Sequence, residues 1–301
     1  MLGDIKVATA QEPTLQRIEA LVGRRTESDR RMGYAWMIVP LLPLAAAVAI
    51  GAILAGILAS IVTKIGNLSQ PTTAQSAIEP IAGGILAAYG LAALVFLGVS
   101  FLGALSFYYL MDRRNQHFIR QQLLFSTLHR YLLSKVPTSQ NVSQLGYLSE
   151  DSAYEERARP AGLWALLFVF LTPIVSLIAS YSLTQDLRRH QELQSKYQAA
   201  LIPSLLEAGF QQPNFPPRSS RTRDPVLFVI LYAITGGLFW IYWYYTLLRD
   251  YNEHFADQAR FEDQILSLII PPPTEKKCGT CGGVVPRTAR FCPNCGSQQR
   301  A

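Results

Sequence analysis

The chain has 301 residues, of which 50% are hydrophobic and only 16% are charged, compared with about 25% charged residues in a typical soluble domain. The deficit of charged residues comes from a few long stretches that contain none, which excludes an ordinary soluble globular fold for the whole chain. The formal net charge is +6, and the positions of the basic residues bear on orientation in a membrane.

Four stretches of the sequence lack Asp, Glu, Lys and Arg. They are 32, 32, 26 and 24 residues long, and about 20 apolar residues suffice for a helix to cross a hydrocarbon core of about 30 Å. We therefore predict an all-α polytopic membrane protein with about four transmembrane helices and amphipathic extensions. The predicted spans are residues 34–63, 81–111, 161–184 and 225–248.

Residues 1–33 are polar and mixed in charge, and we predict that they form a cytoplasmic N-terminal segment. Within them, Leu15, Ile18 and Val22 recur at helical spacing, which predicts a short amphipathic helix along the membrane surface. The first apolar stretch starts too late and is too long to be a signal peptide, so we expect the N-terminus to be retained.

The polar segments after the second and third spans are predicted to begin as helices. In residues 112–159 the helical pattern extends as far as Ser134. The third span contains Pro173, which is typical of a kink. We expect its helix to continue to Ile202, where Pro203 would end it.

The distribution of basic residues favours a cytoplasmic location for both termini. With this orientation the inside segments hold 20 Lys and Arg and the outside segments hold 7. Six of those seven lie in residues 185–224, and this segment therefore disagrees with the predicted orientation. Either the third helix continues past the outer headgroups, or one stretch does not fully cross and the number of spans is odd. The prediction is a multi-pass cell-membrane protein.

A weak internal repeat follows the spans. The second and fourth spans each end in an aromatic pair and continue into Asn-x-His-Phe, at residues 115–118 and 252–255. After the third span, a Tyr, an Asp and a His repeat the spacing found after the fourth. This pattern indicates that helices leave the bilayer through an aromatic collar into charged extensions.

The four histidines mostly lie just beyond span ends, where interfacial histidines are common. The four-span topology places His190 on the opposite side of the membrane from the others, so we do not predict a metal-binding or pH-sensing cluster. The histidines are His117, His129, His190 and His254.

The fourth span resembles a known family. Its residues 234–245 read ITGGLFWIYWYY and are followed by LRDYN at residues 248–252. This run resembles the signature of prokaryotic membrane domains catalogued as domain-of-unknown-function family 4234. The resemblance covers roughly 30 of the 301 residues. It implies a prokaryotic membrane protein and implies no activity.

All four cysteines lie near the C-terminus, in two Cys-x-x-Cys knuckles separated by ten residues and each followed by glycine. Four thiolates close a tetrahedral zinc site without leaving a position for water, which indicates structural rather than catalytic Zn²⁺. Two disulfides are the competing interpretation, but a cytoplasmic tail lies in a reducing compartment. The predicted metal ligands are Cys278, Cys281, Cys292 and Cys295.

These features divide the chain into a membrane domain at residues 34–270, a proline linker at 271–275 and a small β zinc ribbon at 276–301. The spans contain no ionisable residue, which argues against proton-coupled transport. Small residues at four-residue spacing, from Ala47 to Ala59 and from Gly84 to Ala92, predict close packing of the first two spans.

The predicted function is a non-enzymatic membrane scaffold or adaptor whose ribbon binds another protein. The alternative is a small channel or transporter for neutral or weakly polar solutes, with the ribbon as a regulatory appendage. The expected partners are the lipid bilayer and a protein. Nucleic acid is a less favoured partner, permitted by the basic tail, and homo-oligomerisation is left open.

Overall fold

A computed structural model describes residues 3–66, 74–215, 217–270, 275–286 and 289–298. By length and composition, three of the described helices could cross a membrane, Tyr34–Thr63, Gly83–Lys135 and Ala161–Glu207. The helical elements are α1 (Gly3–Gly23), α2 (Arg25–Ser28), η1 (Tyr34–Met37), α3 (Ile38–Gly66), α4 (Ala74–Lys135), α5 (Gln140–Glu155), α6 (Ala161–Glu207), α7 (Pro225–Ile234) and α8 (Phe239–Ile269).

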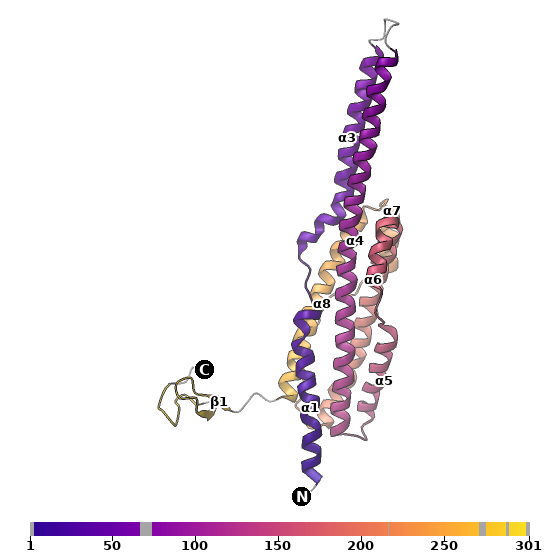
Figure 1. Cartoon of the computed structure of the whole chain (residues 1–301). Coiled ribbons are helices and arrows are strands. Elements are labelled where there is room, and N and C mark those ends of the chain that lie inside the picture. The colour runs from indigo at the N-terminus through magenta and orange to yellow at the C-terminus, as the bar shows by residue number, and fades with distance from the viewer. Residues whose placement is uncertain (1–2, 67–73, 216, 271–274, 287–288, 299–301) are drawn as a thin grey trace.

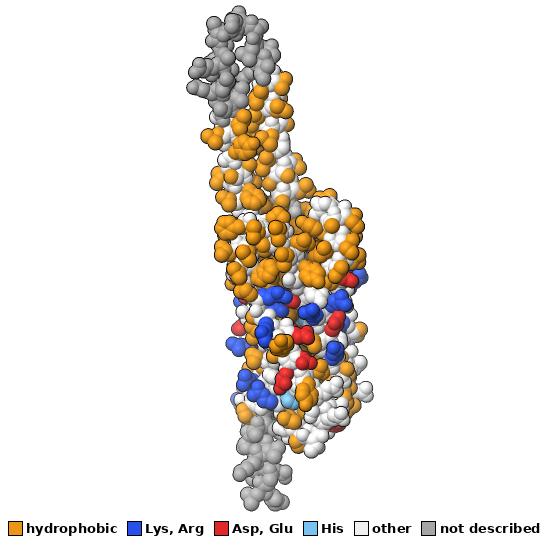
Figure 2. Space-filling view, turned by 90° about the vertical axis from the view of Figure 1, so that its right-hand side faces the viewer, with side chains coloured by type: hydrophobic (Ala, Val, Ile, Leu, Met, Phe, Trp, Pro, Cys, Tyr) orange, Lys and Arg blue, Asp and Glu red, His pale blue; other side chains and the backbone are white. Residues whose placement is uncertain are grey.

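Helices α3 and α4 form a long antiparallel pair that extends beyond the rest of the molecule (Figure 1). In the part of the chain that the structure describes, hydrophobic side chains cover the upper half of the molecule and charged side chains gather below them (Figure 2). The predicted pairing of the first two spans is present. The predicted small-residue stripe does not form the contact on α3, because Ala47, Gly51 and Ala55 are exposed. Larger residues such as Ile50 and Ile57 are the half-buried ones.

Helix α6 folds back on itself. Its backbone leaves the helical region at Leu171, with φ −126° and ψ 35°, just before Pro173, which cannot donate a backbone hydrogen bond. Nε of Arg159 lies 2.7 Å from a carboxylate oxygen of Asp186. In a straight helix these residues would be about 40 Å apart. The predicted span 161–184 therefore reverses near Leu171: its first arm is short, and its second arm runs back and continues beyond residue 184.

Residues 225–248 form a second hairpin. The first arm is α7, and the chain reverses through Gly236 and Gly237, which have φ of 59° and 92°, a region that glycine adopts without steric cost. Nε of Arg223 lies 2.9 Å from the Asp250 carboxylate, so this hairpin also closes at its base. The ten-residue α7 is about 15 Å long, half the thickness of a hydrocarbon core. The prediction of one straight span here is wrong, because an apolar stretch shows length but not a reversal.

The core of the molecule is a bundle of α4, the second arm of α6 and α8, all running in the same direction away from the apolar end. The Phe125 ring of α4 stacks on Tyr197 of α6 with centroids 3.8 Å apart. The hydroxyl of Tyr251 on α8 donates to the Leu183 carbonyl on α6, at 3.0 Å. The second arm of α6 continues past Pro203 to Glu207, so the predicted stop at this proline is wrong.

Helices α1 and α5 cover this bundle. Ile18, Leu21 and Val22 of α1 are buried in the same apolar cluster as Leu128 of α4. The predicted N-terminal helix is therefore present, but its apolar face packs on protein instead of lying along a membrane surface. The sequence pattern shows that one face is apolar and does not show what covers it.

The C-terminal tail contains two short antiparallel strands, β1 (Glu275–Lys277) and β2 (Val284–Pro286), with Lys276 opposite Val285. Val285 is fully buried and packs with Cys278 and Cys292.

Candidate metal centres

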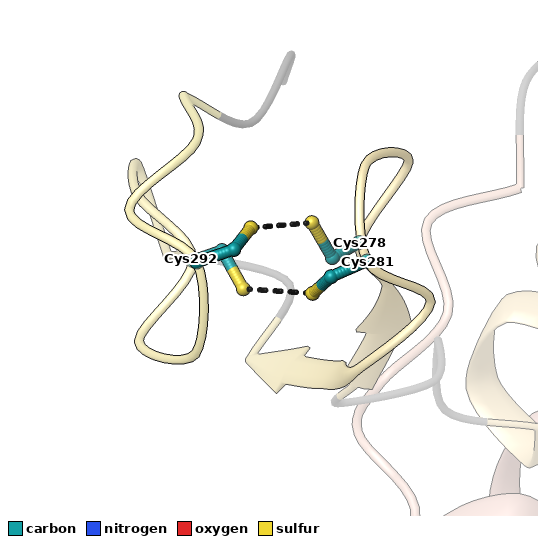
Figure 3. A group of neighbouring side chains, drawn as sticks. Cys278, Cys281 and Cys292 are labelled. Atoms are coloured by element: carbon teal, nitrogen blue, oxygen red, sulfur yellow. Dashed lines mark hydrogen bonds between the residues drawn. The ribbon is translucent and has the colours of Figure 1, made fainter.

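The four cysteines lie together in the tail, as the sequence predicts. In each knuckle a glycine amide donates to the carbonyl of the first cysteine, at 2.9 Å for Gly282 and 2.8 Å for Gly296. Both glycines have positive φ, 69° and 71°, which most other residues avoid. The two loops therefore repeat one turn and turn their thiols toward each other (Figure 3).

The sulfur positions fit a tetrahedral metal. Sγ of Cys278 lies 3.6 Å from Sγ of Cys295, and Sγ of Cys281 lies 3.7 Å from Sγ of Cys292. A Zn–S bond of about 2.3 Å implies sulfurs about 3.8 Å apart in a tetrahedron. A hydrogen bond with the Ser297 hydroxyl and bonds from backbone amides lower the pKa of Cys278 to about 5. At Cys281 a backbone hydrogen bond is outweighed by the other thiols, which raise the pKa to about 12, so the support for a metal comes from the sulfur geometry. The four cysteines could hold a metal ion such as zinc.

A second group of potential ligands lies in the centre of the helical bundle. His117 of α4, His190 of α6 and His254 of α8 are all buried, and their ligand atoms lie within 4.8 Å of one another. Nε2 of His117 and Nε2 of His254 are 3.2 Å apart. From the sequence, we predict His190 on the opposite side of the membrane from the other histidines. The α6 hairpin returns it to the same side, so that prediction is wrong.

Carboxylates orient two of the three imidazoles. Nδ1 of His117 lies 2.9 Å from Asp29, and Nδ1 of His190 lies 2.6 Å from Glu156. An ionised carboxylate can only accept a hydrogen bond, so each Nδ1 donates to its carboxylate and each Nε2 is the ring nitrogen left for another partner. Carboxylate–histidine pairs of this kind accompany metal ligands in proteins.

The electrostatic environment keeps these carboxylates charged. Burial alone would raise the pKa of Asp29 and of Glu156, but the neighbouring His117 and His190, respectively, outweigh it and the pKa of each falls below its ordinary value. Burial, together with the two other histidines, holds the pKa of His254 well below its usual range. His254 is therefore a neutral imidazole, the form that binds metals.

The polar layer continues one helical turn beyond the histidines. Each histidine is followed four residues later by a buried glutamine, Gln121, Gln194 and Gln258. The Gln194 amide donates to the Gln258 carbonyl oxygen, and Gln258 donates to Glu262. A His layer and a Gln layer thus repeat in all three parallel helices.

The sequence contained a signal for this arrangement. A Tyr nine residues before and a Gln four residues after the histidine occur in α4, α6 and α8, and the repeat is therefore threefold. The Asp of the Tyr-Asp-His spacing occurs only after the third and fourth spans, whereas the Tyr and the Gln occur in all three helices. The fourth histidine, His129, lies outside the cluster and packs beside Gly146 of α5.

Comparisons with protein-family models, with curated proteins and with solved structures found no match. The resemblance to family 4234 therefore rests on the residues of the fourth apolar stretch alone.

Proposed function

We propose that the protein is a membrane-anchored, non-enzymatic scaffold that enters the bilayer from one side through three helical hairpins. In this proposal α3 and α4 cross the membrane, and the α6 and α7–α8 hairpins dip into the near leaflet and return. The parallel bundle and the tail then lie on the cytoplasmic side, with both termini.

The distribution of basic residues is the observation that carries this proposal. If both short hairpins return to their starting side, the outside segment is residues 64–80 alone. It contains Lys64 and no other Lys or Arg. The remaining 26 of the 27 basic residues then lie inside, which agrees with the positive-inside rule. The four-span topology left six basic residues on the wrong side.

The ion pairs at the hairpin bases support the same proposal. Arg159 pairs with Asp186 and Arg223 pairs with Asp250, and both pairs are 27 residues apart in sequence. Each pair fixes the entry and exit of a hairpin at one level, beside the charged half of the molecule. Apolar side chains of the arms, including Phe170 at 74% and Ile234 at 76% exposure, would be covered by lipid.

The tail is proposed as a zinc ribbon that binds a protein partner. The four thiols fit a closed tetrahedral site, which suits structural Zn²⁺. Such a short tail has little apolar core, so metal binding would supply much of its folding free energy. The channel alternative is less favoured, because two crossing helices per chain are too few to enclose a path.

Cysteine labelling tests the topology. In a chain whose four native cysteines are replaced by serine, we would introduce Gln70→Cys, Tyr147→Cys or Gln212→Cys, one at a time. An impermeant maleimide applied to intact cells should label position 70 alone, and positions 147 and 212 should react only after permeabilisation. Labelling at 212 in intact cells would refute the one-sided hairpin and restore a third crossing.

Partner capture tests the role of the tail. The native chain, crosslinked in cells, should retain a protein that the Cys278→Ser variant loses and the His129→Gln variant keeps. If both variants retain the same crosslinked proteins as the native chain, the tail is not the binding module.

A further inference from the structure

We propose that His117, His190 and His254 bind one divalent transition-metal ion, with Zn²⁺ as the first candidate, at the axis of the parallel helical bundle. This inference concerns the bundle alone and does not depend on the topology or on the tail. It assigns a metal site distinct from the four cysteines.

The spacing of one imidazole pair fits a common metal, and the ligand atoms of all three histidines lie within 4.8 Å of one another. Zn–N bonds of about 2.0–2.1 Å in a tetrahedron place two ligand nitrogens about 3.3–3.4 Å apart. The Nε2 atoms of His117 and His254 are 3.2 Å apart. Three imidazoles without a thiolate suit Zn²⁺, Ni²⁺, Cu²⁺ or Fe²⁺ more than Mg²⁺ or Ca²⁺, which prefer oxygen.

A hydrogen bond between imidazoles does not explain the cluster. A proton on Nε2 of His254 could be donated to Nε2 of His117 and satisfy that pair. Nε2 of His190 would still have no partner among the described residues, although the side chain is only 2% exposed. A buried polar atom without a partner destabilises the folded chain. A metal ion accepts all three lone pairs and removes this cost.

The ligands are held in place before a metal arrives. Asp29, which contacts His117, also accepts from Arg120 at 2.8 Å, and Glu156, which contacts His190, accepts from Ser152 at 2.6 Å. Each carboxylate therefore has a partner of its own and cannot turn away from its histidine without losing it. Fixed imidazoles of this kind raise metal affinity.

An open cavity of about 300 Å³ provides an approach to the site. Its walls include Ser28 and Arg120, which both hydrogen-bond to Asp29. The histidines themselves do not line the cavity, so Ser28 and Arg120 would have to move for an ion to pass from it to the Asp29–His117 pair.

The expected role of the ion is to fasten the three hairpins together. Each ligand lies on the helix that follows a different apolar hairpin, α3–α4, the two arms of α6, or α7–α8. One metal ion at this level fixes the mutual position of all three exits from the apolar region.

Metal counting on the full-length protein tests the proposal. The chain, purified in detergent, is stripped, reloaded with Zn²⁺ alone and desalted, and zinc per chain is measured by mass spectrometry. We expect His190→Gln to hold one zinc ion fewer per chain than the wild type, and the matched control His129→Gln to hold as many as the wild type, whether or not the tail is loaded. Circular dichroism and a monodisperse elution profile check that each variant is folded.

A second variant keeps the test informative if His190→Gln fails to fold. Glu156→Gln retains all three imidazoles and loses the carboxylate that orients His190. It should bind as many zinc ions as the wild type at saturation, but release one of them at a chelator concentration about 10–100-fold lower than the wild type. Equal zinc content in the wild type and His190→Gln, or unchanged release in Glu156→Gln, would show an adventitious ion only and overturn the proposal.

Discussion

Replacing Asp186 by Asn should open the base of the α6 hairpin. The Asp186 carboxylate lies 2.7 Å from Nε of Arg159 and 3.1 Å from Nε of Arg114. Arg114 is almost completely buried, at 2% exposure, whereas Arg159 is one-third exposed. The substitution keeps the shape of the side chain and removes its charge, so Arg114 is left as a buried cation without a counter-ion.

The cost follows from this burial. Breaking a buried ion pair from one side destabilises a protein by about 3–5 kcal/mol. Arg114 keeps a hydrogen bond to the Arg157 carbonyl and a position over the Phe118 ring, so we expect the lower end, about 3 kcal/mol. At about 2–4 °C per kcal/mol for a chain of this size class, the melting temperature should fall by about 6–12 °C.

Thermal unfolding of the detergent-solubilised protein, followed by far-ultraviolet circular dichroism, measures this shift. The matched control is Glu192→Gln, which breaks the exposed pair with Arg188 on the same helix and should cost less than about 0.5 kcal/mol. If Asp186→Asn unfolds within 2 °C of Glu192→Gln, where about 6–12 °C is expected, the ion pair does not hold the hairpin closed.

Three further predictions concern other parts of the chain. Gly103→Ala should destabilise the protein by about 1–3 kcal/mol in the same melting assay, because the methyl group of the new alanine would overlap the aromatic ring packed on this glycine. The control is Gly98→Ala, which should cost nothing because Gly98 has open space around it. Cys278→Ser should lose one zinc ion per chain and leave the protein in the membrane fraction, and loss of the protein from that fraction would show that the tail is needed for insertion. Burial alone would raise the pKa of Asp257, but hydrogen bonds from Ser219 and the next residue outweigh burial and lower the pKa. The Asp257 carboxylate therefore stabilises the loop at residues 219–220 fully at any pH above its unfolded pKa of about 3.9. This stabilisation is lost as the pH falls from that value through the lower pKa of the folded state. In limited proteolysis, the loop of the native chain should be cut faster below pH 4 than at pH 7. The loop of the Asp257→Asn variant should be cut at the same rate at both pH values.

The sequence was sufficient where the determining pattern was local. Two Cys-x-x-Cys knuckles with their glycines specify their own turns, and the structure brings Cys278 and Cys295 together as the spacing predicts. Helical extensions beyond the apolar stretches were also predictable, since α4 continues to Lys135, close to the expected end at Ser134.

The reversals were not predictable from apolar length, because a hairpin of two short arms and one straight helix have the same composition. The information lies in long-range pairs such as Arg159 with Asp186, which only the folded chain brings together. The histidine cluster depends on those reversals, so it could not be recognised while His190 was placed across the membrane. For the two reversals, the signal available in the sequence was the equal separation of the two Arg–Asp pairs.

The short hairpins give the protein unequal widths in the two halves of a bilayer. Near their apices six helical segments lie together: α3, α4, the two arms of α6, α7 and the start of α8. Farther along, only α3 and α4 remain. With helices about 10 Å across, the four additional segments displace about 300 Å² of lipid from the near leaflet and none from the far one. With the proposed topology, a dense array of copies would therefore bend the membrane with its cytoplasmic leaflet on the convex side.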